Sequence, residues 1–250
     1  MAKFMKELQQ LTKDQLYTCL KNQSEDFYST VSSTLDFTLF GDQSFNEEDL
    51  SEFLEMLDKE TAEKIKTTSL QPDEDELPTI IFAENEVSTT LDLVTEDGEG
   101  YKVILFDKDI HLSGDLFIED YIVLIVLGNI NAKHIIVNGS LYCSGSLSAD
   151  ILFGASSNDH ETYAAGDITT SLIAENGHYT VAEGSIHSKY LISLHNEIKG
   201  QAGKFIENIS LDGSNEAEFL CPEIIDENGY FDEESFLNFI SSNPADTVFK

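Results

Sequence analysis

The chain has 250 residues, of which 41% are hydrophobic, which is enough for one large domain or two smaller ones with a real core. It carries 47 acidic residues against 14 basic ones, all of them lysines, and its formal net charge at pH 7 is −33. A field of this sign repels polyanions, and no arginine is present to bind phosphates in a bidentate way, so the composition argues against nucleic acids and anionic membrane surfaces as partners.

Residues 1–75 are expected to form a helical N-terminal region that ends in an acidic linker. Thr12 is a suitable cap for an amphipathic segment that reaches Leu20. A second helix is predicted after Asn46, where an apolar stripe covers residues 50–57. The first residues lack the apolar run of a signal peptide, and the three widely spaced cysteines are expected to stay reduced. We therefore expect a cytoplasmic protein.

Residues 71–100 contain ten acidic residues and no lysine. The first four acidic residues lie between two prolines, and each proline disfavours helix in the residue before it, which predicts the linker. Beyond the linker, short strands are predicted at residues 80–82 and 91–93. Asp97-Gly98 is a plausible hairpin turn before a further strand at 103–106.

Residues 76–205 are expected to form a β-solenoid, because a loose internal repeat runs through them. Four segments align on a glycine: Gly128-Asn129-Ile130, Gly145-Ser146-Leu147, Gly166-Asp167-Ile168 and Gly184-Ser185-Ile186. Position +2 after each glycine is Ile or Leu, position +4 is Ala, Thr or Ser, and positions +7 and +8 are apolar. The steps from one glycine to the next are 17, 21 and 18 residues.

This period suits one turn of a parallel β-solenoid with inward apolar side chains at +2 and again at +7 or +8. The small residue at +4 would fit a tight corner, and the glycine would open each strand where a Cβ would obstruct the chain. Stacked coils would then form a column of Ile and Leu side chains. An antiparallel sandwich with coincidental glycines is the alternative.

Residues 206–250 are expected to form an acidic C-terminal flank with a capping helix. Residues 226–230 look like a turn, and Asp232 is predicted to cap a helix that ends at Ile240, before Pro244. Such a helix would cover the open edge of the last coil, which otherwise invites polymerisation.

In its Gly-[Asn/Ser/Asp]-[Ile/Leu] repeats the sequence resembles bacterial β-solenoid proteins of the polymer-forming cytoskeletal type, the bactofilin-like group. The repeats, followed by Cys221-Pro222-Glu223-Ile224-Ile225-Asp226-Glu227-Asn228-Gly229 and a short helix, are similar to acidic relatives found in polymorphic-toxin settings. Several of those relatives are thought to act as immunity factors. The resemblance covers roughly residues 100–245. The variable repeat length and the charged flanks depart from the filament-forming pattern.

No residue pattern predicts catalysis, a cofactor or a metal. The six histidines contain no HxH, HxxxH or HExxH pair and are expected on the surface or at corners: His111, His134, His160, His178, His187 and His195. Solenoid acyltransferases need a strict six-residue repeat and a basic cluster for coenzyme A, and both are missing. No Gly-x-Ser-x-Gly elbow is present, and neither candidate glycine loop supplies the oxygen ligands of an EF-hand.

The charge gives the functional prediction. Residues 101–200 hold twelve acidic residues and five lysines, so the flanks carry most of the charge. We predict a non-enzymatic protein that binds a basic protein by electrostatic complementarity, and the resemblance implies a nuclease-type toxin that is neutralised. The predicted partner-binding residues are Asp73, Glu74, Asp75, Glu76, Glu84, Glu86, Glu223, Asp226, Glu227, Asp232, Glu233 and Glu234.

Other interpretations of the charge and the repeats stay open. The acidic surface could serve only to keep the chain soluble. The chain could be a bactofilin-like scaffold that polymerises through its solenoid ends, or a trimeric acyltransferase. For the leading hypothesis we expect a monomer or small oligomer.

Overall fold

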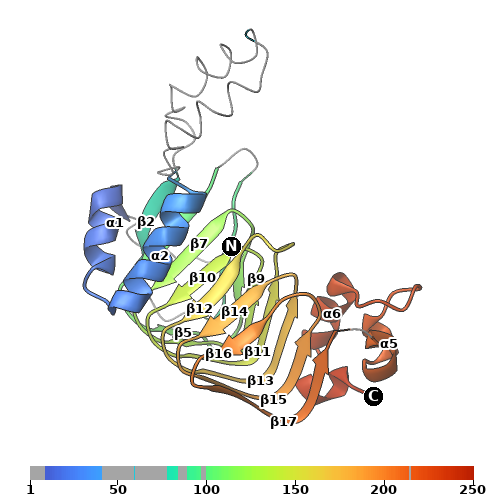
Figure 1. The fold of residues 1–250 in the computed structure, drawn as a ribbon. Coiled ribbons are helices and arrows are strands. Elements are labelled where there is room, and N and C mark those ends of the chain that lie inside the picture. The colour runs from blue at the N-terminus through green and yellow to red at the C-terminus, as the bar shows by residue number, and fades with distance from the viewer. Residues whose placement is uncertain (1–8, 41–58, 60–77, 84–88, 97–99, 214) are drawn as a thin grey trace.

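The computed structural model describes residues 9–40, 59, 78–83, 89–96, 100–213 and 215–250. Its centre is a parallel β-solenoid of about seven turns (Figure 1). The predicted fold is confirmed, and the antiparallel sandwich is excluded, because the repeat strands pair in parallel. Helices from the N-terminal region lie on one side of the solenoid, and a C-terminal helical segment lies on another.

The elements follow one another as a short helical region, a long series of strands and a second helical region. The helical elements are α1 (Lys13–Leu20), α2 (Glu25–Thr38), α5 (Glu216–Phe219), η2 (Pro222–Ile224), α6 (Glu233–Ile240) and η3 (Ala245–Val248). The strands are β1 (Gln9–Gln10), β2 (Thr79–Ala83), β3 (Leu91–Leu93), β4 (Lys102–Phe106), β5 (Ile110–His111), β6 (Leu116–Ile118), β7 (Ile122–Val126), β8 (Ile130–Asn131), β9 (His134–Val137), β10 (Ser140–Cys143), β11 (Leu147–Ala155), β12 (Glu161–Ala164), β13 (Ile168–Asn176), β14 (Tyr179–Ala182), β15 (Ser185–Ser193), β16 (Ile198–Gly200) and β17 (Gly203–Asp212).

The coils have three sides. The first side is the sheet β1-β2-β4-β7-β10-β12-β14-β16. The second sheet bends, because its long strands lose their pairing for one residue at Asp150, Ser171 and Lys189. Its part before the bend, with β5 and β8, is the second side, and its part after the bend, with β3, β6 and β9, is the third side.

Apolar side chains stack in columns inside the coils. The +2 column is Ile110, Ile130, Leu147, Ile168 and Ile186. The +7 column is Ile135, Leu152, Ile173 and Leu191. Every member is at most 1% exposed, and burial of such a side chain stabilises the fold by about 1.5–3 kcal/mol. Position +7 is therefore the inward one, and position +8 points outward, because neighbours along a strand alternate.

The repeated glycine stands where one coil touches the next, at the glycine corner between the first and second sides. Gly145 N donates to Gly128 O over 2.9 Å, and Gly166 N donates to Gly145 O over 2.8 Å. A Cβ on Gly166 would lie 2.9 Å from the backbone C and O atoms of Gly145, which is closer than real Cβ contacts come. The predicted obstruction is confirmed.

The residue after each glycine forms a second ladder at this corner. Its side-chain oxygen accepts a hydrogen bond from the backbone N–H of the equivalent residue in the next coil. Asn129 Oδ1 accepts from Ser146 N (2.9 Å), Ser146 Oγ from Asp167 N (3.1 Å), and Asp167 Oδ1 from Ser185 N (2.7 Å). This ladder explains why Asn, Ser and Asp fill that position, since each is short and carries an acceptor.

The helices α1 and α2 cover the outer face of the first side. Thr12 caps α1 as predicted, because its side chain accepts from Gln15 N and the Gln15 side chain accepts from Thr12 N. The buried cluster beneath the helices joins Leu16, Leu20, Phe27, Val31 and Leu35 to Ile80, Val103, Leu105, Val123, Ile125, Tyr142 and Tyr163. The N-terminal helices are thus part of the solenoid's packing.

The C-terminal segment, residues 215–250, covers the outer face of the third side. Its α6 is capped by Asp232 as predicted, but the predicted position across the last coil is wrong. Phe236 packs 4.8 Å from Phe153, centroid to centroid, and both belong to a cluster with Leu172 and Ile192. The helix lies here because the outward +8 positions form an apolar surface that must be buried.

Asp97 and Gly98 lie outside the described residues, but the strands on either side of them do not pair as the predicted hairpin. β3 pairs with β6 in one sheet, whereas β4 pairs with β2 and β7 in the other, all in parallel. Consecutive strands of a coil lie on different sides, so β3 and β4 cannot pair with each other as a hairpin. The predicted helix after Asn46 and the acidic linker lie outside the described residues. The last strand, β17, continues to Asp212, past the predicted boundary at residue 205.

Stability measurements on two glycines test the glycine corner. Gly166→Ala should lower the free energy of unfolding by about 2–4 kcal/mol, because its Cβ meets backbone that cannot move away. Gly100→Ala is the matched control: no atom lies within 4 Å of its Cβ, so we expect a change within about 0.5 kcal/mol. Urea unfolding followed by circular dichroism measures both, and equal effects would contradict the packing argument.

Candidate functional site at the polar corner

The polar corner is the turn from the third side back to the first. Between β11 and β12 this turn has five residues, 156–160. The equivalent turns of the preceding and following coils have two residues each, 138–139 and 177–178. Ser157 and Asn158 in this longer turn have φ angles of 53° and 76°. The extra residues account for the 21-residue step in the repeat. An irregular loop on a regular scaffold is a usual place for binding residues, so this corner is the candidate site.

A buried imidazole holds the longer turn in place. His178 is fully buried, and its Nδ1 lies 2.9 Å from Ser156 Oγ while its Nε2 lies 2.9 Å from Thr162 Oγ1. Both ring nitrogens thus have hydroxyl partners, which suits the neutral ring with one donor and one acceptor. Burial, with a smaller contribution from His160, lowers the pKa of His178 to about 3.

A buried carboxylate joins the two turns of the polar corner that follow the longer one. Glu175 is fully buried, and its Oε2 accepts from the backbone N–H of Gly177 (2.8 Å) and His178 (3.2 Å). Its Oε1 accepts from the backbone N–H of His195 (2.7 Å) and Asn196 (2.8 Å). Four backbone donors balance the charge without a lysine, so Glu175 fixes two consecutive turns of the polar corner together.

A Ser–His–Asp arrangement lies beside this network. Ser140 Oγ is 3.1 Å from His160 Nδ1, and His160 Nε2 is 3.5 Å from Asp120 Oδ1. Ser140 is only 3% exposed, and the neighbouring cavity, which reaches Thr34 of α2, holds about 140 Å³. A buried hydroxyl in so small a space cannot receive an acyl substrate, so the arrangement is best explained as structural hydrogen bonding.

A cleft of about 580 Å³ opens outside this network, between the polar corner and the start of α6. We call it the corner cleft, and its main polar residues are Asp120, Asn138, Asn158, Asp159, Asn176 and Glu233. No described lysine lines it. Asn138 Oδ1 is buried and has no hydrogen-bond partner among the described residues, although a buried acceptor normally has one. The corner cleft is therefore rich in acceptors and negative charge.

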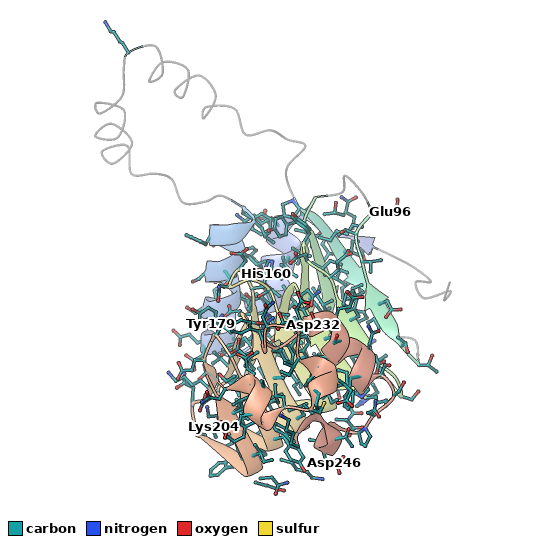
Figure 2. The ribbon with its side chains drawn as sticks, turned by 90° about the vertical axis from the view of Figure 1, so that its right-hand side faces the viewer. Glu96, His160, Tyr179, Lys204, Asp232 and Asp246 are labelled. Atoms are coloured by element: carbon teal, nitrogen blue, oxygen red, sulfur yellow. The ribbon has the colours of Figure 1, made fainter. Side chains whose placement is uncertain are left out.

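The C-terminal segment supplies one wall of the corner cleft. Asp232 Oδ1 accepts from Ser235 N over 2.8 Å and so begins α6, which sets Glu233 beside Asn176. Burial raises the pKa of Glu233, with Asp232 and Asp120 adding to the effect, while the Asn176 hydrogen bond opposes it. Figure 2 shows His160 and Asp232 on the same face of the molecule. Carboxylates that are distant in sequence thus face one space.

The predicted partner-binding residues fall into two sets. Asp73, Glu74, Asp75, Glu76, Glu84 and Glu86 lie outside the described residues. The other six lie in the C-terminal segment, where Glu223 is on η2, Asp226 and Glu227 are in the predicted turn, and Asp232, Glu233 and Glu234 begin α6. Of these six, Glu233 lines the corner cleft.

Two of the carboxylates at the turn and the helix start are partly engaged within the segment. Asp226 Oδ1 accepts from Asn228 N and Tyr230 N over 2.9 and 2.8 Å. These hydrogen bonds lower the pKa of Asp226, and those from Ser235 lower the pKa of Asp232. Both side chains remain anions while they shape the backbone.

Asp120 and Asp159 of the corner cleft were missed from sequence. Their signal was the 21-residue step, which marks the coil with the longer turn, but the repeat gives no information on which earlier residues lie beside it. Asp120 precedes the strand β7, two coils before the longer turn. Its approach to the cleft depends on the three-dimensional stacking of the coils.

The expectation that the histidines lie on the surface or at corners is partly wrong. His111, His187 and His195 are exposed. His160 and His178 are at the polar corner but buried, and His134 is buried at the start of β9, where Nδ1 lies 3.1 Å from Asp115 Oδ1. Each buried imidazole has a hydroxyl or carboxylate of another coil beside a ring nitrogen, which lowers the cost of burying it.

Within the described ranges, no three His, Cys, Asp or Glu side chains are arranged to hold a metal ion. Cys143 and Cys221 are buried and Cys19 is half-buried, and all three are unpaired. Among the helices that the structure describes, none has the length and hydropathy needed to cross a bilayer.

Comparison with known proteins identifies no relative of this chain. No protein-family model matches it, and no curated protein and no solved structure does so either. The candidate site is therefore interpreted from the chain's own geometry and charge.

The buried histidine predicts a pH dependence. His178 has a folded pKa near 3, below the ordinary value of 6.5, so the unfolded chain binds the proton more readily and stability falls as pH drops below 6.5. His178→Gln removes this titration. We expect the stability advantage of the native chain over this variant to shrink by about 2 kcal/mol between pH 6.5 and 5.

Urea unfolding at several pH values measures this difference. The control is His187→Gln, which changes an exposed imidazole outside this buried network. Using the difference between two chains removes the effect of the overall negative charge. A constant difference for His178→Gln would show that the imidazole is not held neutral.

Proposed function

We propose that this chain is a non-enzymatic inhibitor that binds and neutralises a basic protein toxin. The single observation that carries the proposal is the corner cleft, in which Asp120, Asp159 and Glu233 face one space that no described lysine lines. The formal charge of −33 supports the same conclusion, because it favours a cationic protein partner and repels nucleic acid.

The chemistry of the corner cleft suits a lysine or arginine side chain of that partner. Carboxylates form the strongest hydrogen bonds with ammonium and guanidinium groups. The unpartnered Asn138 Oδ1 offers a further acceptor, and a buried acceptor left without a partner costs about 1–3 kcal/mol. A guanidinium with five donors would satisfy several of these acceptors together.

The identity of the target rests on the resemblance to acidic, bactofilin-like relatives in polymorphic-toxin settings. A nuclease-type toxin binds phosphates through lysines and arginines, and an acidic protein that engages those groups would exclude the substrate. The other acidic residues, including Glu223, Glu227 and Glu234, would raise the association rate and need no fixed contact. The three unpaired cysteines support a cytoplasmic location.

Affinity capture from the native cell tests the proposal. The tagged full chain should retain a protein with a pI above about 9, whose activity is lost when the complex forms. Stopped-flow association should slow by at least about tenfold between 0.05 and 0.5 M NaCl, because salt screens the long-range attraction. An association rate that does not change with salt would overturn the electrostatic mechanism.

Charge variants test the role of the corner cleft. Asp120→Asn/Asp159→Asn/Glu233→Gln should weaken binding of the captured protein by at least about a hundredfold, because three charged contacts are lost. The control, Asp92→Asn/Glu207→Gln/Asp246→Asn, removes the same charge from exposed positions elsewhere. It should reduce only the association rate, by a few-fold at low salt. Equal losses of affinity in the two variants would show that the corner cleft is not the binding site.

A further inference from the structure

The C-terminal end of the solenoid has open strand edges. β16 and β17 are the last strands of their sheets, and no other described strand pairs with their outer edges. Six of the ten residues of β17 are exposed. A depression of about 250 Å³, lined in part by Ile198, Lys204 and Asp212, opens into this last coil. Such an edge is a template for adding another chain.

The inward columns change from apolar to polar residues in this coil. In the +2 column, Ile186 pairs with Lys204, so a lysine occupies the register position that Ile or Leu fills in the five preceding coils. In the +7 column, Leu191 pairs with Ser210. The two main apolar columns of the core therefore both end in polar residues at the open end (Lys204 is labelled in Figure 2).

The backbone of β17 is irregular as well. Ser188 pairs with Ile206 and Tyr190 pairs with Ile209, so β17 contains one residue more than β15 between these pairs. This β-bulge breaks the register that β11, β13 and β15 keep with one another across the bend at Asp150, Ser171 and Lys189. A regular coil stacked on β17 could not pair with the backbone donors and acceptors on both sides of the bulge in one register.

The opposite end is also altered. On the first side, β1 pairs with β2 in antiparallel orientation, with Gln9 opposite Phe82 and Gln10 opposite Ile81. A parallel strand from another copy would have to displace β1 before it could continue the sheet. Head-to-tail stacking of two copies thus meets an obstacle at each end.

We infer that the last coil is a built-in stop against strand addition, which keeps the chain from polymerising although its edge is open. Stacking a second copy on β17 would enclose the Lys204 ammonium at the end of a column of Ile and Leu side chains, and would take Asp212 and Glu197 of the same depression out of water with it. Removing such charges from water costs more than burying the apolar residues that fill these positions in the earlier coils. The inference concerns self-association and stands independently of the toxin proposal.

Sedimentation velocity and negative-stain microscopy of the full chain test the inference. The native chain should be a discrete particle at both 0.15 and 0.5 M NaCl, since the higher salt screens the repulsion between copies. Lys204→Ile/Ser210→Leu restores both apolar columns. At 0.5 M NaCl it should shift from the 27.8 kDa monomer to multiples of that mass or to filaments.

Two controls separate the inward positions from surface hydrophobicity. Lys189→Ile/Ser171→Leu makes the same changes at the bends of earlier coils and should stay monomeric. Lys204→Glu keeps a charge at the inward position and should also stay monomeric. Circular dichroism confirms that each variant is folded. If the double variant does not fold, self-association of the single variants Lys204→Ile and Ser210→Leu is measured instead, because both positions are exposed and should accept one substitution.

Three results would overturn the inference. The first is a native chain that forms filaments at either salt concentration. The second is a folded Lys204→Ile/Ser210→Leu variant, or folded single variants, that remain monomeric at 0.5 M NaCl. The third is self-association of Lys189→Ile/Ser171→Leu to the same extent, because general hydrophobicity would then explain the result.

Discussion

The close contact between successive coils at the glycine corner governs the rest of this structure. Backbone N–H and carbonyl groups of Gly128, Gly145 and Gly166 bond directly from coil to coil, which brings each coil onto the next without room for a Cβ. Once this spacing is set, the side chain at each remaining position must pack against the equivalent side chains in the coils above and below it. Ile and Leu do so inside, and Asn, Ser and Asp do so at the corner, where each binds the next coil's N–H.

The candidate site arises where one coil departs from this regularity. The longer turn at 156–160 cannot rest on an identical turn, so it is held by side chains that have no equivalent in the repeat. His178 binds it from the following coil, Glu175 holds the turn that carries His178, and α6 approaches the longer turn from the outside. The corner cleft forms between these irregular parts. Regular stacking supplies rigidity, and the interruption supplies a surface with its own chemistry.

The repeat made much of this fold predictable from sequence. The spacing of Gly, Ile and Leu predicted the solenoid, and Thr12 and Asp232 marked the starts of helices correctly, because capping depends on a few adjacent residues. The hairpin at Asp97-Gly98 failed since local turn chemistry does not reveal on which side of a coil the next strand lies.

The position of α6 failed for a related reason. Two adjacent apolar residues at +7 and +8, such as Leu152 and Phe153, do not show from sequence that one points inward and one outward. Glu233 was predicted as a binding residue because it belongs to the acidic C-terminal flank, whereas Asp120 and Asp159, which line the same cleft, were not predicted. Only the stacking of coils brings those three carboxylates to one space.

The two flanking helical segments have a consequence for how the molecule opens. A bare solenoid can fray one coil at a time, because each coil touches only its neighbours. Here the cluster under α1 and α2 extends from Ile80 to Tyr163, and the cluster under the C-terminal segment extends from Ile151 to Leu211. The two clusters overlap along the chain, so both helical segments pack against coils in the middle of the solenoid. Loosening either end requires peeling off a helix that also holds the middle, which makes unfolding of the whole column more cooperative.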